Sequence, residues 1–204
     1  MRKNKKKFLY IISPNKIEKN FYHYLREILK LNTTSIFQLR LKSYSHKTKI
    51  NIGHKVKKIC RIYKVKLIIN DDVILAKELG ADGCHLGQSD WHPTKARKIL
   101  GNKIIGITCH NSVKLVREAI KNNASYIALG AFFNSKTKKI RYKSSLSLIQ
   151  KVKKLTTKPV VAIGGINHKN YKKILLNHAD FIAISGYIWK NKNLNPFDAI
   201  KLLK

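Results

Sequence analysis

Short apolar runs alternate with longer amphipathic stretches, and this alternation constrains the fold more than any other feature of the sequence. Eight short apolar runs have the length of buried strands: residues 8–12, 35–39, 66–69, 83–86, 104–107, 126–129, 160–163 and 181–184. Eight stretches carry apolar residues at helical spacing: residues 17–31, 47–63, 73–79, 93–100, 113–122, 146–155, 170–177 and 196–203. This repeat predicts an α/β fold, a single-domain (β/α)8 TIM barrel over residues 1–204. Because periodicity does not show closure, a doubly wound open sheet is the alternative.

The cysteines and the apolar runs bear on the location of the chain. Cys60, Cys84 and Cys109 are odd in number and far apart, which favours reduced thiols and a cytoplasmic protein. The basic start is followed by an apolar run too short for a signal peptide. No stretch approaches the roughly 20 apolar residues that cross a membrane, so no membrane partner is expected.

Basic residues far outnumber acidic ones, with 43 Lys+Arg against 10 Asp+Glu and a formal net charge of +33. Such an excess is typical of nucleic-acid-binding proteins. The lysines, however, are spread over the outer faces of nearly every predicted helix, and no nucleic-acid motif occurs. We therefore expect a solvated lysine-rich surface without a nucleic-acid partner, whose field favours anionic, phosphorylated substrates.

Half of the ten acidic residues lie within residues 67–90: Asp71, Asp72, Glu78, Asp82 and Asp90. Asp71 follows one predicted strand, and Asp90 lies just beyond the next. The carboxyl ends of parallel strands share one rim, where the active sites of such folds are built. Two carboxylates on that rim suit Mg²⁺, which takes one or two carboxylates together with substrate phosphate oxygens.

Cationic and amide side chains alternate at the end of the second predicted strand. Gln38, Arg40 and Lys42 point to the same side of an extended chain, because side chains alternate along a strand. An amide, a guanidinium and an ammonium that converge there would clamp an anion. An exposed polar strand edge explains the same pattern equally well.

Phosphate-binding features follow three later strands. The loop after the sixth strand carries hydroxyls and lysines, including Ser135, Thr137 and Lys138. The seventh strand ends in a double glycine that includes Gly165, and the eighth ends at Ser185. Barrels frequently bind phosphate with the loops after these last two strands. A generic basic loop and ordinary turns are the alternative, but the coincidence at two strand ends favours a phosphate cup.

No nucleophile–base pair stands out among the residues that could react. His85 lies inside an apolar strand, so we expect a core histidine with satisfied hydrogen bonds, and we expect His110 in a loop. Cys109 lacks an activating motif. The rim as a whole predicts the ionisation of a diphosphate, driven by charge neutralisation.

The same motifs resemble those of the thiamine phosphate synthase family, in order and over almost the whole chain: QLRLK, INDD, ADGCHLGQSD, IGITCHN, LGAFFNSKTKK, VVAIGGI and ADFIAISG. The resemblance implies a (β/α)8 barrel and a Mg²⁺-dependent transferase. Its substrates would be 4-amino-2-methyl-5-hydroxymethylpyrimidine diphosphate and a thiazole phosphate, and its products thiamine phosphate and diphosphate. It also implies dissociative chemistry, in which diphosphate leaves before the thiazole nitrogen captures the pyrimidine-methyl cation.

The resemblance assigns roles residue by residue. Ligands of Mg²⁺ would be Asp71 and Asp90. The pyrimidine diphosphate would be held by Gln38, Arg40, Lys42, Asn70, Thr108 and Lys138, of which Arg40, Thr108 and Lys138 are the predicted catalytic residues. The thiazole phosphate would be held by Ser135, Thr137, Gly165, Ile184 and Ser185.

Departures from the family pattern leave other functions open. Ala131 and Asn134 replace residues that are usually proline, and Ser13-Pro14 replaces the usual Thr-Asp. A related thiazole tautomerase shares the barrel but lacks the metal aspartates and has a histidine where this chain has Ala131. A repurposed paralogue that binds a phosphorylated heterocycle is one alternative, and a basic protein that binds nucleic acid is another. The oligomeric state, including a homo-oligomer, stays open.

Overall fold

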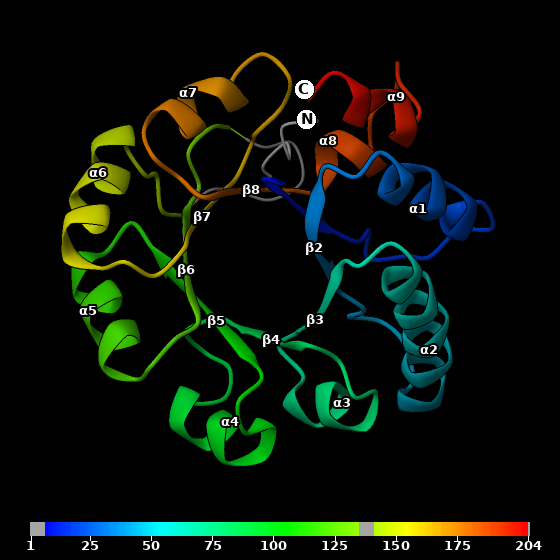
Figure 1. Cartoon of the computed structure of the whole chain (residues 1–204), viewed down its shortest axis with the longest axis horizontal. Helices are drawn as coiled ribbons and strands as arrows, with labels where there is room; N and C mark the ends of the chain where they lie inside the picture. The colour runs from blue at the N-terminus through cyan, green and yellow to red at the C-terminus, as the bar shows by residue number, and fades with distance from the viewer. Residues whose placement is uncertain (1–6, 135–140, 204) are drawn as a thin grey trace, which may run out of the picture.

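The strands form a closed parallel barrel in the computed structural model, which describes residues 7–134 and 141–203. Each strand pairs in parallel with the next, and β1 pairs with β8 to close the ring, as Figure 1 shows. The eight strands are β1 (Leu9–Ile12), β2 (Thr34–Leu39), β3 (Lys66–Asn70), β4 (Gly83–Leu86), β5 (Ile104–His110), β6 (Tyr126–Gly130), β7 (Val160–Ile163) and β8 (Phe181–Ile184). The predicted barrel is therefore confirmed, and the open sheet is excluded.

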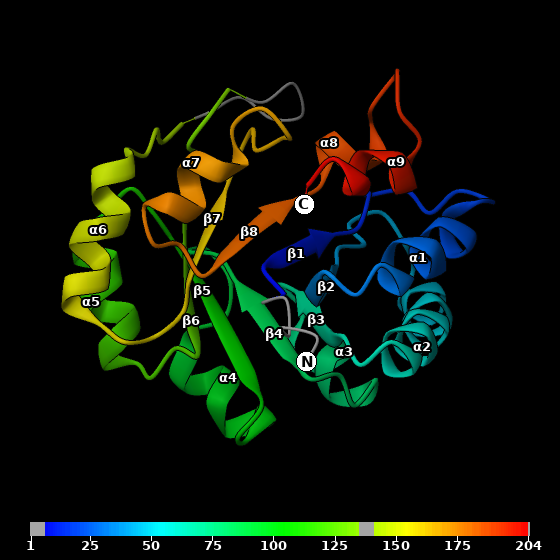
Figure 2. The same ribbon diagram turned by 45° about the horizontal axis from the view of Figure 1, so that its top comes forward.

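Helices surround the barrel on its outside, and turning the molecule shows the same coat from another side (Figure 2). Within the described residues these are α1 (Phe21–Lys30), α2 (His46–Ile62), α3 (Val73–Glu78), α4 (Pro93–Leu100), α5 (Val113–Lys121), α6 (Leu146–Leu155), α7 (Tyr171–Leu176), α8 (Gly186–Trp189) and α9 (Pro196–Lys201). Side chains just before several helices fix where they start. The Ser45 hydroxyl accepts from Thr48 N at 3.3 Å before α2, and Ser112 does the same for Leu115 N before α5.

Most observed bounds lie within two residues of the predicted ones, and three differences are larger. β5 continues to His110, so Thr108 lies within the strand and not after it. α1 starts only at Phe21. The short helix α8 was not predicted, because four residues contain too little periodicity to indicate a helix.

The core has two layers because the strands are buried on both faces. Leu67 and Ile69 point outward into the layer between strands and helices, whereas Ile68 between them points into the barrel. The inner layer also contains Tyr126, whose ring packs against Gly106 of the neighbouring strand. A Cβ on Gly106 would lie 1.9 Å from that ring, so the glycine makes room for the tyrosine inside the barrel.

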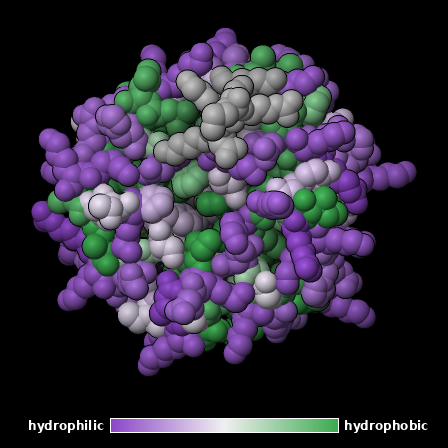
Figure 3. Space-filling view, viewed as in Figure 1, coloured by the Kyte–Doolittle hydropathy of each residue, from purple (hydrophilic) through white to green (hydrophobic). Residues whose placement is uncertain are grey.

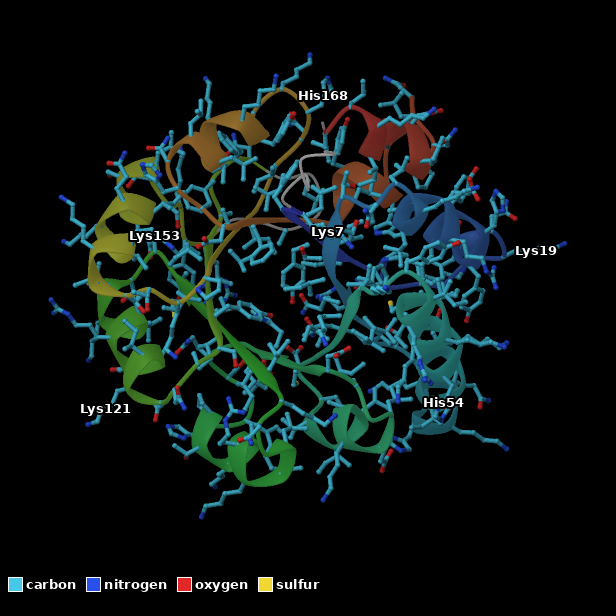
Figure 4. The ribbon with its side chains drawn as sticks, in the orientation of Figure 1. Lys7, Lys19, His54, Lys121, Lys153 and His168 are labelled. Carbon is cyan, nitrogen blue, oxygen red and sulfur yellow. The ribbon has the colours of Figure 1, made fainter. Side chains whose placement is uncertain are left out.

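Hydrophilic residues are spread over the face that Figure 3 shows, with hydrophobic ones between them. Lys19 and Lys121 extend outward on different sides of the molecule (Figure 4). This distribution agrees with a solvated lysine-rich surface. Among the described residues, no helix is long and apolar enough to cross a membrane.

Candidate active site

Two amides meet at the carboxyl end of the barrel. Gln38, at the end of β2, is 3% exposed, and its Nε2 donates to Asn70 Oδ1 at 2.6 Å at the end of β3. Parallel pairing in register places Gln38 beside Ile68, so the two amides reach the same rim. Two of the predicted diphosphate ligands are therefore neighbours, which an exposed polar strand edge would not require.

The Asp71 carboxyl lies on this rim in a backbone conformation that few residues adopt. Its φ is 62°, and its backbone N donates to His85 O at 2.8 Å across the β3–β4 pair. Burial raises the pKa of Asp71, and the nearby Asp90 carboxylate raises it further. Lys42, 3.6 Å from Asp71 Oδ2, acts in the opposite direction, as does Arg40. The structure thus brings together both predicted metal ligands and two predicted cations.

The donor set on the rim fits Mg²⁺. Asp90 Oδ2 already accepts from Gly87 N at 2.7 Å, which holds its carboxylate toward Asp71. Oxygen ligands are what this hard cation takes, and it commonly uses two carboxylates plus phosphate oxygens and water. Among the described residues, no group of three or more His, Cys, Asp or Glu side chains could hold a metal. A metal bound here would therefore depend on the substrate for further ligands.

The other acids of the 67–90 stretch have structural roles. Asp72 Oδ1 caps α3 by accepting from Leu75 N at 3.0 Å. Asp82 accepts from Leu67 N at 2.9 Å near the start of β3 and pairs with Lys66. The acid cluster therefore has two causes, of which only the Asp71–Asp90 pair belongs to the rim.

A polar chain crosses the barrel interior below the rim. Tyr10 OH lies 2.7 Å from Tyr126 OH, which lies 2.8 Å from His85 Nδ1. The other ring nitrogen, Nε2, lies 2.8 Å from Thr108 Oγ1. These four residues and Gln38 line a small cavity on the barrel axis. The prediction of a satisfied core histidine is confirmed, and His85 holds the hydroxyl of Thr108, a predicted ligand of the diphosphate.

His85 is expected to make the fold less stable in mild acid. Burial lowers the pKa of His85 from the ordinary value of 6.5 to about 4, whereas the Asp90 carboxylate acts to raise it. Between pH 4 and pH 6.5 the unfolded chain therefore binds more protons than the folded one. The contribution of the neutral His85 to the free energy of unfolding is full above pH 6.5 and falls as the pH drops toward 4. This one residue predicts a loss of about 2 kcal/mol between pH 7 and pH 5. Urea unfolding at both values, compared with His85→Gln, measures it; an equal loss in the variant would contradict the assignment.

The predicted phosphate cup lies at the ends of β7 and β8. Gly165 has φ of 65°, and a Cβ there would lie 2.4 Å from the carbonyl oxygens of Phe133 and Asn134. The absence of a side chain at Gly165 therefore lets the neighbouring loop approach its backbone closely. The Ser185 hydroxyl donates to Ser13 O at 3.3 Å. Ile184 is 3% exposed, and its side chain belongs to the hydrophobic core.

Three predicted ligands, Ser135, Thr137 and Lys138, lie outside the described residues. The strand before them is described, and so is Tyr142 after them.

His110 ends β5 with φ of 51°, and its ring stacks on Tyr142 with centroids 4.3 Å apart. His110 was predicted in a loop but belongs to the strand end.

Sequence reasoning missed two contributors on the rim. Ser13 accepts from Arg40 N at 2.9 Å, and the amide oxygen of Asn15 accepts from Arg40 Nη1. Neither residue type carries a motif, and both contacts join segments that are far apart in the sequence. Only the departure noted at Ser13-Pro14 pointed to this segment.

Comparisons with known proteins agree with the geometry. The family described as thiamine monophosphate synthase matches residues 9–188. A thiamine-phosphate synthase of Pelagibacter ubique is 56% identical over 207 aligned residues, which cover 100% of both chains. One from Clostridium acetobutylicum is 38% identical over 95% of this chain and 94% of its own. Among solved structures, a thiamine phosphate pyrophosphorylase from Pyrococcus furiosus matches with a TM-score of 0.85 at 29% identity, covering 98% of this chain and 95% of that one.

Proposed function

The chain belongs to the thiamine monophosphate synthase family and is a transferase of thiamine biosynthesis, and from this premise we propose its substrates, its metal and its site residues. The substrates are 4-amino-2-methyl-5-hydroxymethylpyrimidine diphosphate and a thiazole phosphate. The products are thiamine phosphate and diphosphate, and the metal is Mg²⁺. The observation that carries this proposal is the convergence of the Asp71–Asp90 pair with Lys42, Arg40 and the Gln38–Asn70 amides on one rim.

The reaction breaks the bond between the pyrimidine methylene carbon and the diphosphate oxygen, whose electron pair leaves with the diphosphate. The thiazole nitrogen then supplies the electron pair of the new carbon–nitrogen bond. Bound Mg²⁺, held by Asp71 and Asp90, would supply positive charge to the leaving group. Arg40 and Lys42 add fixed positive charge beside it, which favours the separated charges of the transition state over the bound substrate.

The amides and hydroxyls of the rim orient the reacting groups. Gln38 and Asn70 hold each other at 2.6 Å, which fixes both amides before the substrate arrives. Thr108 is held by the neutral His85 ring. Lys138, Ser135 and Thr137 belong to the same proposal through their places in the family motif. On the other side of the rim, Gly165, Ile184 and Ser185 receive the phosphate of the thiazole.

The synthase function is favoured over the tautomerase alternative. The tautomerase resemblance requires a histidine at the position of Ala131 and lacks the rim aspartates, whereas Asp71 and Asp90 face each other here. We further propose that the enzyme works in the cytoplasm, where its three buried cysteine thiols would stay reduced.

An omission assay tests the substrates. Purified protein is incubated with the pyrimidine diphosphate, the thiazole phosphate and Mg²⁺, and thiamine phosphate is followed by mass spectrometry. We expect product only when both substrates are present. Release of diphosphate without thiamine phosphate would contradict the proposed pair of substrates. Condensation of a thiazole without a phosphate, at a rate equal to that of the thiazole phosphate, would contradict it as well.

Ser185→Ala is expected to weaken the binding of the thiazole phosphate. Loss of one hydrogen bond to a charged group corresponds to roughly a 10-fold rise in the KM of that substrate. The KM of the pyrimidine diphosphate, measured on the same variant, is the internal control and should rise less, because Ser185 is connected to the clamp through Ser13 and does not itself hold the diphosphate. Equal changes in both constants, or none, would remove Ser185 from the phosphate cup.

A further inference from the structure

The segment that follows β1, residues 13–15, touches both proposed ligand subsites. We propose that Ser13 is a positioning residue that fixes the diphosphate clamp and the phosphate cup relative to each other, and that Asn15 orients the Arg40 guanidinium. This inference rests on the proposed function, in which Arg40 holds the diphosphate and Ser185 lies in the cup.

Ser13 makes three contacts with proposed site residues through three different atoms. Its backbone N donates to Gln38 O at 2.9 Å, its Oγ accepts from Arg40 N at 2.9 Å, and its carbonyl oxygen accepts from Ser185 Oγ at 3.3 Å. Gln38 and Arg40 lie at the end of β2, whereas Ser185 follows β8. One buried residue, 1% exposed, therefore joins the strand ends on either side of β1.

The hydroxyl of Ser13 has a specific task. β1 ends at Ile12, and Arg40 N, just beyond the end of β2, donates to the Ser13 side chain. The hydroxyl proton in turn faces the carbonyl oxygens of Pro14 at 3.0 Å and Arg40 at 3.4 Å. A side chain that both donates and accepts here has a fixed rotamer, and it fixes the backbone from which the Arg40 side chain extends.

The carbonyl before Ser13 is also held. Trp189 Nε1, from α8, donates to Ile12 O at 2.7 Å. Together with the Ser185 Oγ bond to Ser13 O at 3.3 Å, this joins the end of β1 to α8 and its cap by two hydrogen bonds. The turn after β1 is thus anchored to the cup side of the rim as well as to the clamp side.

Asn15 acts on the other end of Arg40. Its amide oxygen accepts from Arg40 Nη1. A neutral acceptor uses one of the five donors of the guanidinium and leaves its charge uncompensated, whereas a carboxylate would pair with it. Asn15 therefore aims the guanidinium while its charge and remaining donors stay available for an anion.

Ser13→Ala, Ser13→Thr and Ser35→Ala test the role of Ser13. Ser35 is the matched control: it lies at the start of β2, near the opposite end of the barrel from Ser13, and its hydroxyl donates to Lys7 O at 2.8 Å. We expect Ser13→Ala to raise the KM of the pyrimidine diphosphate about 10-fold, a larger change than in kcat, and to raise that of the thiazole phosphate less, because the lost hydroxyl holds Arg40 whereas the contact with Ser185 is made by the Ser13 carbonyl. Ser13→Thr, which keeps the hydroxyl, should restore both constants to within about twofold.

Three results would overturn this role: wild-type KM values in Ser13→Ala, no recovery in Ser13→Thr, or the same KM changes in Ser35→Ala. A structural defect alone would lower the thermal midpoint of Ser13→Ala and Ser35→Ala without separating their KM values. Product formation by the unaltered protein is measured alongside. Its absence would overturn the proposed function together with this inference, whereas product with unaltered Ser13→Ala constants would overturn the inference alone.

Asn15→Asp tests the charge argument with a substitution of nearly equal shape. Inorganic diphosphate in the presence of Mg²⁺ serves as the probe, and calorimetry measures its affinity for the unaltered protein and for the variant. We expect the variant to bind about 10-fold more weakly, because the new carboxylate pairs with Arg40. Equal or tighter binding in Asn15→Asp would show that Asn15 does not govern the guanidinium.

Discussion

Asp71→Asn is expected to lower kcat at least about 100-fold, and Asp90→Asn to do the same, because each removes half of the proposed carboxylate pair for Mg²⁺. The loss should fall on the chemical step, since charge on the departing diphosphate is largest in the transition state. Steady-state kinetics at several Mg²⁺ concentrations measure it. The variants should also need more Mg²⁺ for half-maximal activity than the unaltered enzyme.

The adjacent acid supplies the control for this prediction. Asp72 caps α3 and pairs with Lys49 at 3.5 Å, and asparagine is also a good helix cap. Asp72→Asn should therefore keep the Mg²⁺ dependence and most of the activity. If Asp71→Asn and Asp90→Asn retained full turnover, or if Asp72→Asn lost as much as they did, the metal assignment would be wrong.

Arg40→Ala is expected to lower kcat/KM for the pyrimidine diphosphate about 100-fold. The guanidinium lies close enough to Asp71 to lower the pKa of that carboxyl, so it lies beside the place proposed for the metal and the leaving group. Arg40→Lys should recover only part of the activity, because an ammonium keeps the charge but not the forked pair of donors. Initial rates with the pyrimidine diphosphate varied at saturating thiazole phosphate measure both effects.

Arg26→Ala is the matched control, since Arg26 is exposed on α1 and its Nη1 donates to Tyr22 O at 3.3 Å. Arg26→Ala removes the same positive charge as Arg40→Ala but at a distant place. A fall in kcat/KM common to both variants would therefore reflect the electrostatic field of the whole protein. Equal kcat/KM in Arg40→Ala and Arg26→Ala would exclude Arg40 from the clamp.

The barrel was predictable because local patterns determine it. Short apolar runs and stretches with helical spacing alternate as the units of the fold do, so the strands β4, β7 and β8 occur at the predicted bounds. Closure of the barrel could be expected only from the number of strand–helix units, because the pairing of β1 with β8 joins residues more than 170 positions apart in the sequence. The helix α8 is too short to have a periodic signal.

The site was predictable in its charged residues but not in their supports. Asp71 and Asp90 could be placed from their positions after strands, because parallel strands bring such positions together. The two causes of the acid cluster could not be separated, since Asp72 as a helix cap and Asp71 on the rim are adjacent in the chain. The contacts of Ser13 depend on three-dimensional proximity between β1, β2 and β8, for which composition and spacing carry no signal.

The central claim is that one rim binds diphosphate through a metal held by Asp71 and Asp90. Calorimetric titration of inorganic diphosphate into the unaltered protein and the Asp71→Asn/Asp90→Asn double variant, each with Mg²⁺ and with EDTA, tests it most directly. We expect the unaltered protein to bind diphosphate at least about 10-fold more tightly with Mg²⁺ than with EDTA, and the double variant to lose that difference. An unchanged Mg²⁺ dependence in the folded double variant would contradict the claim and place the metal elsewhere.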